Sequence, residues 1–206
     1  MVRTLIFTLR YEICHISRQS ACTAESTEYV SRISQMMETW FVLSRDMGEN
    51  EAANLFISMT DKPDDVNVPD RYGKTLLCRA VGQNIMPAVK RILGRKEVIV
   101  NLGNGGPYNN YNTGDTPLHR AVSRGAEMVK LLLDHGADPN LVNAQGDTPL
   151  VGVVSTAPEI IELLITHGAD PWIANDRGDN AFDVFVGSPE IIEILNKAGD
   201  RTTAEK

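Results

Sequence analysis

A repeat with a constant period constrains the fold of this 206-residue chain more than any other feature. The segment Gly-Asp-Thr-Pro-Leu occurs at 114–118 and 146–150, and a degraded copy, Gly-Asp-Asn-Ala-Phe, follows after the same step at 178–182. A second segment, His-Gly-Ala-Asp-Pro, recurs with that step at 135–139 and 167–171. Because two independent markers share one period, they argue against a chance repetition and predict a stack of similar structural units.

The residue types within one unit predict two short helices. Thr116 suits the cap of a helix N-terminus, and Pro117 suits the first helical position, where a missing N–H group costs nothing. A second helix is expected from Glu127 to Asp134 and is apolar around most of its circumference, so neighbours must cover it. Gly136 is expected to end that helix in a left-handed conformation. The same residue types recur one period later along the chain.

This pattern resembles the ankyrin repeat family. The resemblance rests on Thr-Pro-Leu-His-Arg-Ala at 116–121, Gly125, Val-Lys-Leu-Leu-Leu at 129–133 and Gly-Ala-Asp at 136–138. It implies an all-α fold, an ankyrin-repeat solenoid of stacked helix-turn-helix units with hairpin fingers. The step from Gly114 to Gly146 is one residue short of the family's usual period, and the shortage falls between Gly125 and Val129. Val151 replaces the signature histidine in the following unit, so the hydrogen bonds of that histidine are expected to be missing there.

The resemblance divides residues 25–200 into about five repeats. Their expected boundaries are a divergent repeat at 25–69, repeats at 70–111, 112–143 and 144–175, and a capping repeat at 176–200, followed by a polar tail at 201–206. An earlier marker, Gly-Lys-Thr-Leu-Leu at 73–77, precedes Gly114 by more than one period, which places nine extra residues in the 70–111 repeat. Alternating apolar residues from Leu5 to Ile13 predict a strand in the segment 1–24. We interpret that segment as a cap on the first repeat, with a partner-binding edge as the alternative.

The sequence carries no recognisable catalytic or metal-binding constellation. Gly-Lys-Thr at 73–75 resembles the end of a phosphate-binding loop, but Val68 stands where that motif needs glycine. The four histidines have no cysteine or histidine partners at metal-ligand spacing. We therefore expect that the protein is not an enzyme and uses neither a cofactor nor a metal.

Charge and composition limit the partners. The net charge is -7, and residues 115–200 hold fourteen acidic and five basic side chains, so binding to nucleic acid is disfavoured. Three irregularly spaced cysteines fit a reducing compartment. No apolar run reaches the roughly 18 residues of a membrane span. We expect a cytoplasmic monomer that binds a protein and contacts neither membrane nor nucleic acid.

The resemblance also implies which residues bind the partner, because ankyrin proteins use hairpin tips and the adjoining inner helices. The candidates are Arg71, Tyr72, Lys74, Asp115, Gln145, Asp147, Arg177 and Asp179 on the tips, Arg79, Arg120 and Arg124 on inner helices, Tyr108 and Tyr111 in the nine-residue insertion, and Trp172. Arg71, Tyr72 and Arg120 are expected to contribute most, since Tyr and Arg often dominate interface energies. Trp172 either projects from its hairpin or packs on the capping repeat.

These observations predict a non-enzymatic protein-protein interaction module, an adaptor or an inhibitor. Two alternatives remain. The divergent repeats and the unusual N-terminal segment also fit an effector of a pathogen or symbiont that engages a host protein. The third reading is a regulatory fragment of a larger enzyme, because repeats of this kind support many unrelated functions.

Overall fold

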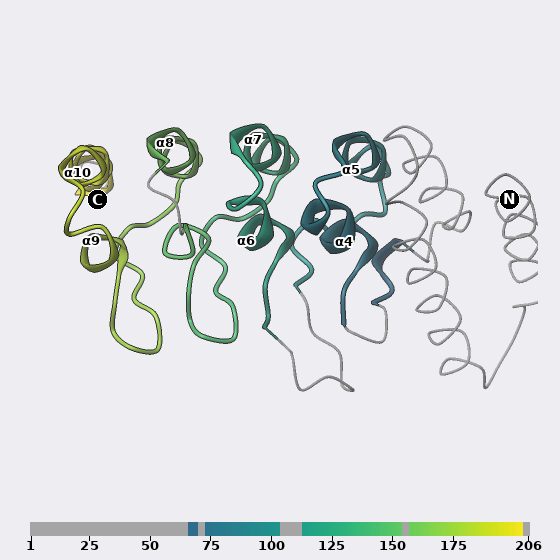
Figure 1. Ribbon diagram of the computed structural model, residues 1–206, viewed down its shortest axis with the longest axis horizontal. Coiled ribbons are helices and arrows are strands. Elements are labelled where there is room, and N and C mark those ends of the chain that lie inside the picture. The colour runs from purple at the N-terminus through teal and green to yellow at the C-terminus, as the bar shows by residue number, and fades with distance from the viewer. Residues whose placement is uncertain (1–65, 70–72, 104–112, 154–156, 204–206) are drawn as a thin grey trace, which may run out of the picture.

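The computed structural model describes residues 66–69, 73–103, 113–153 and 157–203, which form a row of stacked helical units (Figure 1). The helices are α4 (Leu76–Gly82), α5 (Met86–Leu93), α6 (Pro117–Ala121), α7 (Ala126–Asp134), α8 (Pro158–Thr166), α9 (Ala181–Val184) and α10 (Pro189–Thr203). Figure 1 shows α4, α6 and α9 in an inner row beside the loops, and α5, α7, α8 and α10 in an outer row. The described residues contain no strand, which confirms the all-α solenoid.

Several expectations fall outside the described residues. They are the strand between Leu5 and Ile13, residues 25–65 of the divergent first repeat, and the candidates Arg71, Tyr72, Tyr108 and Tyr111. Among the described residues, no helix has both the length and the apolar character needed to cross a bilayer.

Threonine caps the start of the inner helices α4 and α6, and Asn180 caps α9. The Thr116 side chain accepts a hydrogen bond from the His119 main-chain N–H, and the His119 ring in turn accepts one from the Thr116 N–H, which completes a capping box. Pro117 occupies the first turn of this helix. Thr75 caps α4 in the same way, with its hydroxyl accepting from Cys78 N at 3.2 Å. The predicted cap at Thr116 is confirmed.

The expected inner helix after Thr148 is instead a turn. Thr148 Oγ1 still accepts a hydrogen bond from Val151 N at 3.3 Å, but residues 149–152 do not continue into a helix. Two substitutions account for the difference. The Val151 side chain has no polar atom with which to complete the capping box, and Gly152 lowers the helix propensity at the position where α6 has Arg120.

The outer helices α7 and α8 end at left-handed glycines, as predicted. Gly136 has φ +84°, its N–H donates to Leu133 O, and the Ala137 N–H donates to Leu132 O, both at 3.0 Å. This pair of bonds is a Schellman motif, which satisfies carbonyls that the helix end leaves unpaired. Gly168, with φ +88°, closes α8 by the same pair of bonds.

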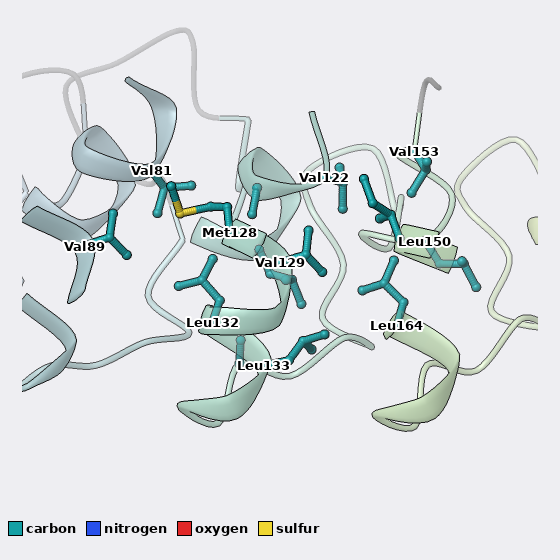
Figure 2. Close-up of a cluster of buried hydrophobic side chains, with 14 of the residues drawn as sticks. Val81, Val89, Val122, Met128, Val129, Leu132, Leu133, Leu150, Val153 and Leu164 are labelled. Carbon is teal, nitrogen blue, oxygen red and sulfur yellow. The ribbon is translucent and has the colours of Figure 1, made fainter. Parts of the chain in front are cut away.

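The core runs along the stack rather than gathering at one centre. One connected cluster of buried apolar side chains extends from Val66 to Leu195. Figure 2 shows Met128 and Leu132 of one helix pair facing the side chains of the preceding unit, with Leu164 of the next unit close by. Since two short helices cannot bury both of their faces alone, each unit depends on its neighbours for stability.

Candidate functional site

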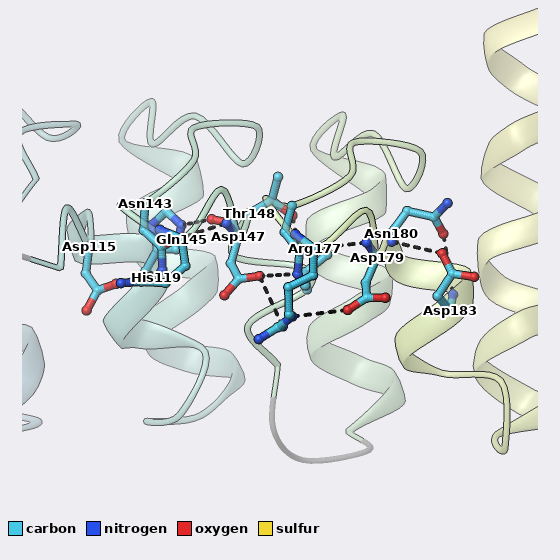
Figure 3. Close-up of polar contacts among 12 residues, drawn as sticks. Asp115, His119, Asn143, Gln145, Asp147, Thr148, Arg177, Asp179, Asn180 and Asp183 are labelled. Carbon is cyan, nitrogen blue, oxygen red and sulfur yellow. Dashed lines mark hydrogen bonds and ion pairs between the residues drawn. The ribbon is translucent and has the colours of Figure 1, made fainter.

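Asparagine and aspartate side chains join consecutive hairpin fingers, which we define as residues 143–147 and 175–179 together with the described part of the preceding one, 113–115. Asn143 Nδ2 donates to Asp115 Oδ1 at 3.1 Å, and Asn175 Nδ2 donates to Asp147 Oδ1 at 2.7 Å (Figure 3). A main-chain N–H of each later finger also donates to a main-chain carbonyl of the preceding finger, at 2.8 and 3.1 Å. These bonds tie the fingers into one row.

The same two asparagines shape their own fingers. Asn143 Oδ1 accepts from the main-chain N–H groups of Gln145 and Asp147, at 2.9 and 3.0 Å. Asn175 Oδ1 accepts the equivalent pair, both at 3.0 Å, and this residue is buried. Neither asparagine was among the predicted site residues. The signal that identifies them is their recurrence after one period, each three residues before the finger glycines Gly146 and Gly178.

The candidate residues on the fingers divide into two groups by their contacts. Asp115 and Asp147 accept the hydrogen bonds that join the fingers, so their carboxylates hold the row together. Gln145 and Arg177 are exposed at the tips. The Arg177 Nε lies 3.2 Å from Asp179 Oδ2 and its Nη2 lies 3.9 Å from Asp147 Oδ1, so the guanidinium is oriented although its side chain is 71% exposed.

The inner helices place two arginines in equivalent positions. Arg79 and Arg120 each follow the glycine of their finger by six residues and are half-buried on α4 and α6. A side chain at Gly82 would meet the Arg120 guanidinium at 3.2 Å, which shows that Arg120 reaches across to the end of α4. The equivalent positions further along are Gly152 and the exposed Val184. At this position the inner row is therefore basic in its first two described units and uncharged afterwards.

The remaining candidates lie at the edges of this surface. Lys74 is half-buried next to the cap of α4, and Arg124 is exposed in the turn between α6 and α7. Trp172 satisfies both readings of the sequence, because it is 59% exposed and its ring centroid lies 4.4 Å from that of Phe182 in the last unit.

Asparagine side chains join consecutive units at a second position as well, and Trp172 stands where this series of bonds ends. At the equivalent position Asn140 Nδ2 donates to Gly168 O at 2.9 Å, and Asn140 Oδ1 accepts from Asp170 N at 2.7 Å. Asn101 makes the corresponding bonds to the unit that follows it. Trp172 instead covers Phe182, whose counterparts in earlier units are buried leucines.

His119 connects its own helix cap to the next finger. Its Nδ1 accepts from Thr116 N at 3.1 Å, so Nε2 carries the proton and donates to Asp147 O at 2.8 Å. Burial lowers the pKa of this imidazole below its usual value, which favours the neutral ring. Val151, at the same position in the next unit, has no polar atom for either bond, as the sequence predicts.

This geometry predicts that stability depends on pH through His119. Because the folded pKa lies below the unfolded value near 6.5, the unfolded chain takes up the proton first as the pH falls. The contribution of His119 to stability is therefore fully present above about pH 6.5 and decreases as the pH falls below that value, with a slope of up to about 1.4 kcal/mol per pH unit. Urea denaturation at pH 7.5 and 5.5 measures this loss, and His119→Gln should reduce it. Equal pH dependence in both proteins would contradict the assignment.

Residues suited to metal binding do not gather in the described part of the chain. No group of three His, Cys, Asp or Glu residues there could hold a metal ion. Cys78 is buried on α4 with Sγ 3.6 Å from Leu102 O, and burial raises the pKa of its thiol, which favours the unreactive protonated form.

Comparison with known proteins supports the repeat architecture. A family model described as ankyrin repeats (3 copies) matches residues 41–143 and 88–176. Palmitoyltransferase ZDHHC13 of Mus musculus is 42% identical over 82 residues, and the proteins of that name from Homo sapiens and Pongo abelii are each 39% identical over 82 residues. Each match covers 39% of this chain and 12% of the relative, so the chain resembles a small part of those proteins.

Proposed function

Because the chain belongs to the ankyrin repeat family, we propose that it is a non-enzymatic module that binds a partner protein through its finger tips and the concave face of its inner helices. The bonded row of fingers is the observation that carries this proposal. Asn143 and Asn175 fix the fingers to one another, while Gln145 and Arg177 stay exposed on them. Side chains held in place before binding lose less entropy in the complex.

The role is that of an adaptor or an inhibitor, acting as a cytoplasmic monomer. The two inner-row arginines, Arg79 and Arg120, support a protein partner with acidic or polar groups opposite the first units. The net charge of -7 opposes binding to nucleic acid.

Affinity capture with quantitative mass spectrometry tests the proposed face. The full chain is compared with Arg120→Glu and Gln145→Arg, and with the control Glu162→Lys on the exposed side of α8. We expect the first two changes to reduce partner recovery at least about tenfold, as charge reversal or a bulky change at an interface centre does. The control should retain recovery. Loss with Glu162→Lys alone would place the partner on the outer helices and contradict the proposal.

The similarity to one segment of a palmitoyltransferase supports a second candidate function, a regulatory part of a larger enzyme. An antibody against residues 113–203 tests this by the size of the native protein on a denaturing gel. A band well above 22.7 kDa supports the larger enzyme, and a band at that mass counts against it.

A further inference from the structure

A groove of about 540 Å³ lies between the unit of α6 and α7 and the start of α8. Its apolar lining is Val122, Ala126, Ala157 and Ile160, and the charged residues at it are Arg124 and Glu159. Val122 and Ile160 are each only 5% exposed and form the floor. Figure 2 shows Val122 between α6 and the Leu150–Val153 turn, so the groove crosses from one unit to the next. It is distinct from the finger tips.

Small residues leave this groove open. Gly125, which precedes α7, has φ +117°, and a Cβ there would meet nothing within 4 Å. It lies in the turn where this repeat is one residue shorter than the family's usual repeat. Ala126 and Ala157 are small as well, and neither helix start has a side-chain cap that would cover it. The described residues therefore supply an apolar floor without a side chain that fills the space above it.

The charged residues of the groove have opposite signs. Arg124 and Glu159 line the same groove, and Arg124 is exposed in its turn. Other charged side chains on α5 and α7 form ion pairs. Lys90 Nζ lies 3.3 Å from Glu127 Oε1, and Lys130 Nζ lies 2.7 Å from Asp134 Oδ2. Within the described part of the chain, Arg124 and Glu159 have no such ion-pair partner. The groove thus presents one cation and one anion beside apolar surface.

We propose that this groove binds an extended segment of the partner protein, which places one apolar side chain on the floor, a carboxylate opposite Arg124 and a cationic group opposite Glu159. The inference rests on the proposed function and names the chemistry of the partner. The volume lies in the usual range for ligand sites, roughly 300–1,000 Å³. It holds one or two side chains, whereas the apolar stripe of a docked helix needs contacts over several turns. Charge complementarity then selects the segment.

Titration of the full ¹⁵N-labelled chain with end-blocked peptides tests the proposal by NMR. The probes are acetyl-Asp-Ser-Leu-Ser-Lys-amide, a neutral version with Asn and Gln at the ends, and a version with serine in place of leucine. We expect shifts of the amides at 122–126 and of those of Ala157, Glu159 and Ile160 with the first probe. The other two should bind at least about fivefold more weakly, because the neutral version lacks both charges and the serine version lacks the apolar side chain.

Variants separate the groove from the finger tips. Ala157→Phe should fill the groove and abolish the shifts, since Ala157 has an extended backbone with φ −99° and ψ 96° that accepts a large side chain. Ala174→Phe, at an exposed position outside the groove and the defined fingers, is the matched control and should leave the shifts unchanged. Arg124→Glu leaves the core intact and should weaken the charged probe at least fivefold more than the neutral one.

Three outcomes would contradict the proposed binding of a segment in the groove. They are the absence of shifts with every probe, shifts confined to the fingers, and an equal effect of Arg124→Glu on the charged and neutral probes. Partner capture that survives Ala157→Phe but not Arg120→Glu would overturn this inference and leave the proposed function standing. Capture that survives both changes would contradict both.

Discussion

Replacement of Leu132 by alanine is expected to lower the free energy of unfolding by about 3 kcal/mol, the middle of the range for buried leucines. Leu132 is fully buried on α7, and it contributes to the contacts along the stack rather than to one central core. The lost side chain leaves a cavity that neighbouring repeats fill only in part. Urea denaturation followed by circular dichroism measures the change.

Val142→Ala is the matched control for this experiment. Val142 is 50% exposed, so its truncation should cost less than about 0.5 kcal/mol, as most surface substitutions do. The effect of Leu132→Ala should also reach amides in the adjoining units when hydrogen exchange is measured, because each unit is stabilised by its neighbours. Equal losses for the two variants would contradict the packing described here.

Replacement of Gly146 by alanine is expected to cost about 2–3 kcal/mol, from a left-handed backbone and a contact with the next finger. Gly146 has φ +74°, and a Cβ there would approach the main-chain N of Asp176 to 2.7 Å. That approach is too close for any real Cβ, so one finger would have to move away from the other. Thermal and urea denaturation both report the loss.

Gly178→Ala isolates the contribution of the finger contact. Gly178 has φ +86°, but a Cβ there would meet nothing within 4 Å, because no further finger follows among the described residues. Its replacement should therefore cost only the backbone strain, about 1 kcal/mol. The two variants share the strain and differ in the contact. If Gly178→Ala destabilised the protein as much as Gly146→Ala, close packing of the fingers would be refuted.

Local chemistry made several elements predictable. Thr116 and Pro117 favour a helix start by local chemistry, because the Thr116 hydroxyl accepts a hydrogen bond from an unpaired N–H group and proline carries no N–H group to satisfy. Gly136 and Gly168 specify helix ends for an equally local reason, since a positive φ costs glycine little. The constant period of the sequence markers then placed these local units in a stack.

Contacts between repeats were harder to predict from the sequence. Asp115 could be placed on a finger, but its bond with Asn143 joins residues 28 apart and depends on the spacing of the stack. The turn after Thr148 shows that a local cap signal does not always produce a helix. Its cap signal is present, yet Val151 and Gly152 remove the support that a helix needs there. Trp172 both projects from its hairpin and packs on the capping repeat, because one face of its ring lies against Phe182 while the rest of the side chain remains exposed.

The most direct test of the proposed role is hydrogen exchange of the full chain, alone and bound to the partner recovered by affinity capture. A partner on the concave face should slow exchange at the fingers, 143–147 and 175–179, and at α4 and α6. The exposed sides of the outer helices α5, α7 and α8 should exchange as they do in the free protein. Protection confined to those outer helices, with unchanged exchange at the fingers and inner helices, would contradict the account.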